Sequence, residues 1–134
     1  MLATKVEDMK KEEGFTLIEL LVVVIIIGIL AAIAIPAFLN QRESAWISAA
    51  ESDVRNAAIG IETFFTQDQA YPTEAEFLEL VGTEIQTSGQ VTLQNYAVNA
   101  LGNAFTLEAC HARVEGTCPG TATASYDSAS GGLQ

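Results

Sequence analysis

Apolar side chains are concentrated in one segment near the start of the chain. Between Phe15 and Leu39 only Thr16 and Glu19 carry polar side chains, and residues 20–39 form an unbroken apolar run. A helix needs about 20 apolar residues to cross the hydrocarbon core of a bilayer. A core helix of a small domain, in contrast, usually keeps a polar face. The pattern therefore predicts a membrane-spanning helix over residues 15–39.

A different pattern begins at residue 40. Polar and apolar side chains now alternate with a helical period, which predicts an amphipathic helix over residues 40–66 that continues the first one. We expect its apolar stripe to pack against the core of a domain. The positions of that stripe are Trp46, Ala50, Val54, Ala57, Ile61 and Phe64.

Residues 67–134 predict a small α+β head. Thr73 and Glu76 have the spacing of a capping box at the start of a short helix over 74–81, which Gly82 is expected to end. Three later segments favour β-strands by composition and alternation. A small antiparallel sheet packed on the amphipathic helix would bury the apolar faces of both. The predicted strands are 91–98, 104–114 and 121–126.

Composition and charge narrow the functional classes. The chain has 134 residues, of which 49% are hydrophobic, with 17 acidic and 6 basic side chains and a formal net charge of -11. So much apolar content excludes a disordered chain. The acidic excess argues against direct nucleic-acid binding, which needs a basic surface.

The basic residues also predict an orientation for the membrane helix. Lys5, Lys10 and Lys11 precede the apolar run, whereas the nearest cation after it is the single Arg42. Lysine and arginine stay on the cytoplasmic side of a membrane span. We therefore expect the N-terminus inside and the head outside.

Three residues of the apolar run are unusual for a plain anchor. Glu19 is costly at membrane depth, by about 2.5–3.5 kcal/mol at a helix centre and less near an end. Arg42 lies about 35 Å further along a helix, so either protonation or a cation from another molecule must compensate Glu19. Gly28 and Pro36 weaken the helix between them. That segment is either a tolerated kink or a part that changes shape.

The junction before the apolar run reads KKEEGFTLIE at residues 10–19. From Gly14 to about Arg42 the chain resembles type IV pilins and pseudopilins, whose class III signal has a short charged leader, a glycine and then Phe-Thr-Leu-Ile-Glu. The resemblance implies that residues 1–14 are a leader and that a prepilin peptidase cuts between Gly14 and Phe15. The same enzyme would then methylate the new amino group of Phe15.

The resemblance further implies a pilin fold and a homopolymer built through the N-terminal helix. Glu19 would pair with the Phe15 ammonium of a neighbouring subunit, and the segment from Gly28 to Pro36 would extend in the filament. The precursor would sit in the cytoplasmic membrane and meet an inner-membrane assembly platform before joining an extracellular filament. A major type IV pilin is the first choice. A minor pilin, or a pseudopilin of a type II secretion or DNA-uptake system, shares the same N-terminus.

An alternative from another class rests on the sequence Ala-Ile-Ala at residues 32–34. This A-x-A pattern at the end of an apolar run is typical of signal peptidase sites. Cleavage after Ala34 would release a soluble binding domain or enzyme. That reading leaves Glu19 without a role.

The remaining candidate chemistry is sparse. Cys110 and Cys118 are expected to form a disulfide outside the cytoplasm, the alternative being two reduced cysteines. Cys110 and His111 could suggest a metal site or a nucleophile, but a third ligand is not evident. Phosphate-binding glycine loops, serine elbows and carboxylate pairs are also missing from the sequence. We therefore expect a structural protein, with neither enzymatic activity nor a cofactor or metal.

Overall fold

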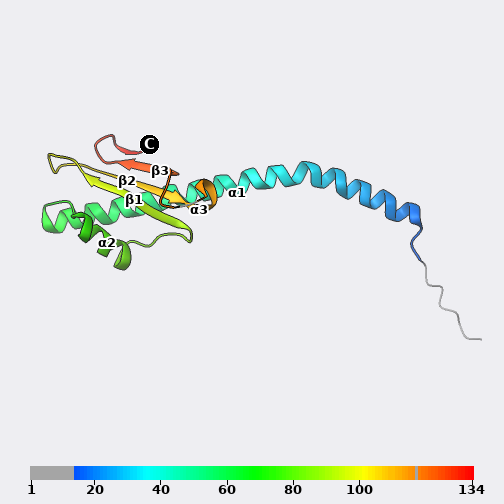
Figure 1. Ribbon diagram of the computed structural model, residues 1–134, viewed down its shortest axis with the longest axis horizontal. Helices are drawn as coiled ribbons and strands as arrows, with labels where there is room; N and C mark the ends of the chain where they lie inside the picture. Colours follow the sequence, from blue (N-terminus) through cyan, green and yellow to red (C-terminus); the bar gives the residue numbers. More distant parts are fainter. Residues whose placement is uncertain (1–13, 117) are drawn as a thin grey trace, which may run out of the picture. The chain divides into compact units, whose positions relative to one another are not determined.

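The computed structural model describes residues 14–116 and 118–134 (Figure 1). The chain divides into two compact units, with the boundary between Phe38 and Leu39, and each unit is described by itself. Helix and strand order confirms the α+β class. The elements are α1 (Leu17–Asp68), α2 (Glu74–Thr83), β1 (Val91–Val98), β2 (Phe105–His111), α3 (Ala112–Glu115), β3 (Ala124–Asp127) and β4 (Gly132–Leu133).

The first unit contains the apolar part of α1. Its large apolar side chains are exposed around the whole helix, from Phe15 to Phe38. The helix is long and apolar enough to cross a membrane, as the hydrophobic pattern predicts. Most of the expected leader, residues 1–13, lies outside the described residues.

The second unit has its core between the later part of α1 and the sheet. The predicted stripe is confirmed, because Ala50, Val54, Ala57 and Ile61 are fully buried. From the sheet, Phe105 and the alternate positions along β2 complete the same apolar clusters. A helix face of period 3.6 and a strand face of period 2 thus bury each other.

The sheet is antiparallel, with strand order β1-β2-β3-β4. The prediction for β1 is confirmed over its full length. A shift in register between Gln94 and Ala97 marks a bulge, where Asn95 has a φ of 52°. Figure 1 shows α2 beside β1, away from the later strands.

The other strands differ from their predicted bounds. The strand predicted to run to residue 114 ends at His111, because His111 Nδ1 accepts the Arg113 N–H and starts α3. The strand predicted over 121–126 is observed over Ala124–Asp127. Its two-residue partner β4 was not predicted, since so short a strand has no periodicity to detect.

Helix α2 begins as predicted. The Thr73 hydroxyl accepts the Glu76 N–H, and Glu76 Oε2 accepts the Thr73 N–H in return. The predicted end at Gly82 was wrong. A glycine ends a helix by adopting a positive φ, and Gly82 does not, so α2 continues to Thr83.

Candidate functional site

The N-terminus of α1 is closed by a reciprocal pair of side chains. Glu19 Oε2 accepts hydrogen bonds from the Thr16 N–H at 2.9 Å and from the Thr16 Oγ1 at 2.8 Å. The Glu19 N–H donates to Thr16 Oγ1 at 3.2 Å. This is the capping-box arrangement, in which each of the two side chains accepts the otherwise unsatisfied backbone N–H of the other residue. Glu19 therefore has polar partners in its own chain.

Thr16 was not predicted as a partner of Glu19, for which the sequence pointed to protonation or to a cation from another molecule. The spacing Thr-x-x-Glu was the signal that could have identified it. The Thr16 hydroxyl supplies no charge, so the carboxylate keeps its need for a cation. Both Thr16 bonds fall on Oε2, and within the described part of the chain no hydrogen bond to Oε1 is found. One carboxylate oxygen thus remains available to a partner.

Phe15 and Glu19 lie on one exposed surface. Phe15 is 90% exposed, and both residues line the same apolar hollow together with Ile18 and Val22. Gly14, the residue before the expected cleavage point, is also exposed. The expected cleavage point is therefore exposed within the described part of the chain.

Gly28 and Pro36 lie within α1, which is helical through both positions. A Cβ added at Gly28 would meet no heavy atom within 4 Å. The glycine is therefore not required by packing inside one subunit. Pro36 removes one backbone hydrogen bond from the helix, so the segment between them is weak but helical here.

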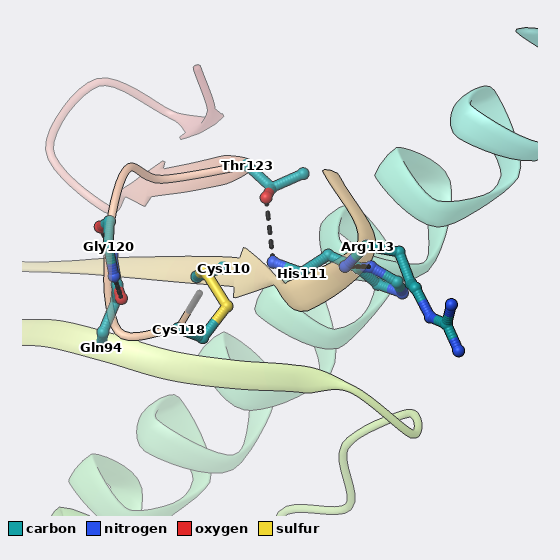
Figure 2. The surroundings of a disulfide bond; sticks show 7 residues. All are labelled: Gln94, Cys110, His111, Arg113, Cys118, Gly120 and Thr123. Carbon is teal, nitrogen blue, oxygen red and sulfur yellow. Dashed lines mark hydrogen bonds between the residues drawn. A yellow bond between two sulfur atoms is a disulfide. The ribbon is translucent and has the colours of Figure 1, made fainter. Parts of the chain in front are cut away.

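The predicted disulfide between Cys110 and Cys118 is formed (Figure 2), with a Cα–Cα distance of 5.8 Å. Cys110 is fully buried at the end of β2. Beside the disulfide, Gln94 on β1 clamps the same loop. Its Nε2 donates to the Gly120 carbonyl at 2.6 Å, and its Oε1 accepts the Gly120 N–H at 3.0 Å.

Sequence reasoning missed this clamp, because a single glutamine in a strand carries no local signal. A second tie in Figure 2 joins the same region, since the His111 N–H donates to the Thr123 hydroxyl at 2.9 Å. The segment that follows Cys118 is thus held to β1 through Gly120 and to the end of β2 through Thr123.

His111 is a packed core residue. It is 3% exposed and stacks on the Trp46 ring, with 5.8 Å between ring centroids. Its neighbour Cys110 is bonded to Cys118, so neither cysteine is a free thiol. Among the described residues, three or more potential ligands never gather as a metal site would require. His111 and the Cys110–Cys118 disulfide therefore stabilise the fold of the head.

Comparison with known proteins agrees with these features. Residues 9–35 match the family model for the prokaryotic N-terminal methylation motif. A type II secretion system core protein G from Pseudomonas aeruginosa is 36% identical over 70 residues, covering 52% of this chain and 49% of that protein. The type IV major pilin protein PilA of Myxococcus xanthus is 43% identical over 61 residues, covering 46% of this chain and 28% of its own length.

A fimbrial protein of Pseudomonas aeruginosa is 42% identical over 80 residues, which cover 60% of this chain and 43% of that protein. The chain spans about half the length of the secretion proteins that it matches. These relatives are named as a secretion-system core protein, a major pilin and a fimbrial protein. The chain thus carries the prokaryotic N-terminal methylation motif and is similar to both type IV pilins and type II secretion core proteins.

Proposed function

We propose that this chain is the main subunit of a type IV pilus and polymerises through the N-terminal part of α1. The observation that carries the proposal is the combination of the methylation motif with an apolar helix exposed on all sides. An isolated subunit in water would leave that surface uncovered at a large cost. A membrane covers it before assembly, and other copies of the helix cover it afterwards.

The chemistry at the start of α1 supports an order in which cleavage and methylation come before pairing with a neighbouring subunit. Cleavage between Gly14 and Phe15 creates an ammonium on Phe15, the residue directly before Thr16. Methylation of that amine keeps its positive charge. Glu19 is already oriented by Thr16, and its second carboxylate oxygen is available. Pairing with the Phe15 ammonium of a neighbour would offset the desolvation of both charges and set the stagger between helices.

The topology follows from the charges that flank the helix. Three lysines precede it, and Arg42 alone follows closely. We place the leader in the cytoplasm, where a prepilin peptidase and an inner-membrane assembly platform act, and the head on the outer side. In spheroplasts of cells that lack prepilin peptidase, where the leader stays attached, added protease should then digest the head and spare a leader-linked tag.

The proposal is tested by identifying the proteins in the surface fraction sheared from cells that express the chain. A main pilus subunit should be the dominant protein of that fraction and should vanish from it when the prepilin peptidase is removed. A chain that remains entirely in the membrane, while other filaments are sheared off normally, would contradict the proposal.

A second candidate function is a pseudopilin of a type II secretion system. The observation in its favour is the similarity to secretion core protein G from several bacteria, including Pseudomonas aeruginosa and Vibrio cholerae. Deleting the gene distinguishes the two functions. A pseudopilin deletion should abolish protein secretion and leave surface pili intact, whereas a main-pilin deletion should do the reverse.

A further inference from the structure

The head carries an apolar groove of about 450 Å³ along α1. Ala58 and Ile59 line it from α1, and Tyr126 lines it from β3. Ile59 is 66% exposed, although it lies on the part of α1 that packs the head. A large aliphatic side chain left uncovered beside an aromatic ring is a candidate contact surface. We call this surface the Ile59 groove.

Charge indicates what approaches the Ile59 groove. Residues 15–134 contain 13 acidic side chains and three arginines. Arg42 lies over the Trp46 ring, and Arg113 Nε donates to Gln90. Arg55 and Glu62 both line the groove. Glu62 Oε1 accepts the Tyr71 hydroxyl, whereas no polar partner for Arg55 is found in residues 14–116 and 118–134. An acidic side chain of a second copy can therefore pair with Arg55, which has no polar partner in the described part of its own chain.

The same head presents a matching apolar protrusion. Leu101 is 83% exposed at the tip of the β1–β2 hairpin. Asn99 fixes that tip, since its Oδ1 accepts the N–H groups of Asn103 and Ala104, and its carbonyl accepts the N–H of Gly102. A side chain held out by an ordered turn loses little conformational entropy when it binds.

An acid accompanies this protrusion. Asp127 and Asn99 line one hollow of about 300 Å³ beside the hairpin. The hairpin therefore offers an exposed leucine at its tip and, beside Asn99, the Asp127 carboxylate, which also accepts the Ala129 N–H and the Ser130 hydroxyl. The Ile59 groove offers an apolar wall with an arginine. The two surfaces share no lining residue, because the groove includes nothing from the hairpin.

We propose that the hairpin tip around Leu101 of one copy docks into the Ile59 groove of a second copy. The inference rests on the proposed function, because it describes how heads meet in the polymer. Contact between two different surfaces of the same chain is heterologous, and such contacts continue into a filament when they do not close a ring. Leu101 covers Ile59, and Asp127 faces Arg55 across the contact.

Cysteine cross-linking in assembled filaments tests this contact. The variant Ile59→Cys with Leu101→Cys is expressed as the full chain in cells and oxidised on the filaments. Both native cysteines are bonded to each other, so any new cross-link forms between the introduced cysteines. We expect a ladder of dimers and higher multimers on a non-reducing gel. The matched control is Ile59→Cys with Leu78→Cys, since Leu78 is exposed to 64% on α2 and belongs to neither surface; it should give monomer.

Two further results separate the inference from the proposed function. Filaments that form normally but give no ladder would overturn the inference and leave the polymerising role intact. Absence of filaments from the unmodified chain would overturn both. Should the double-cysteine variant not assemble, the single variants decide: Ile59→Ser and Leu101→Ser should each lower filament yield relative to Leu78→Ser. Equal yields from all three would reject the contact.

Discussion

Glu19 has two roles that can be separated. It caps the first turn of α1 through Thr16, and it carries the charge that we propose to pair with Phe15 of a neighbour. The cap orients the carboxylate but supplies no countercharge. The negative charge therefore needs a second molecule, whereas the capping role does not.

Replacing Glu19 by glutamine should separate these roles. A glutamine amide accepts the same Thr16 bonds, so the capping box survives without its charge. We expect Glu19→Gln to be cleaved and inserted normally but to give much less sheared filament. Thr16→Ala keeps the charge and loses a cap worth about 1 kcal/mol, so its filament yield should fall less. Full yield from Glu19→Gln would contradict the charge-pairing account.

The raised pKa of Tyr96 predicts that the head loses folding stability at high pH. Burial, with Tyr71 and Glu76 nearby, raises the pKa of Tyr96 to about 12, and its hydroxyl donates to the Pro72 carbonyl at 2.8 Å. The unfolded pKa is about 10, so the stabilising contribution is complete below pH 10 and is lost as pH rises through 12. Burial and Glu62 also raise the pKa of Tyr71, so ultraviolet absorbance should show late tyrosine ionisation that is reduced, not abolished, in Tyr96→Phe. Titration of every tyrosine near pH 10 would refute this assignment.

The helices and strands show which features local sequence determines. The buried stripe of α1 and the Thr73 cap were predicted, because period and capping chemistry act over a few residues. The end of β2 and the strand β4 were not, because they depend on contacts such as that of His111 with Arg113. The Gln94 clamp joins residues 26 positions apart, which a pattern search along the chain does not detect.

Within α1, we propose that the segment from Gly28 to Pro36 extends when the subunit enters a filament. Gly28→Ala meets no clash inside one subunit and should stabilise the helix by about 1 kcal/mol. The variant should therefore insert normally but assemble less well. Gly82→Ala makes the same change in α2, where a Cβ also meets no atom within 4 Å, and should leave filament yield unchanged. Equal yields would count against the extension.

The C-terminal loop should tolerate loss of its disulfide. Cys110→Ser with Cys118→Ser should lower the free energy of unfolding by about 2–3 kcal/mol, as expected for so short a loop. The head should keep its fold, because the Gln94 and Thr123 bonds remain. Urea unfolding of the detergent-solubilised chain, followed by Trp46 fluorescence, measures the change. Adding Gln94→Ala should then destabilise the head further, and no additional loss would contradict the clamp.

At the scale of the whole molecule, two surfaces with different physical demands share one helix. The apolar part of α1 must be covered by lipid or by other subunits, and the later part supplies the core of an acidic head. The sequence predicted this division, because the hydrophobic pattern changes abruptly near residue 39. It did not predict the Ile59 groove, because exposure depends on which neighbouring elements leave a helix face uncovered.

The central claim is that this chain is processed as a pilin-like precursor before it polymerises. Mass spectrometry of the N-terminal peptide from membrane and sheared fractions tests it most directly. The account predicts a mature chain that begins at Phe15 and carries a methyl group on its amine. A mature chain that begins at Ile35, as cleavage after Ala34 by signal peptidase would produce, would contradict it.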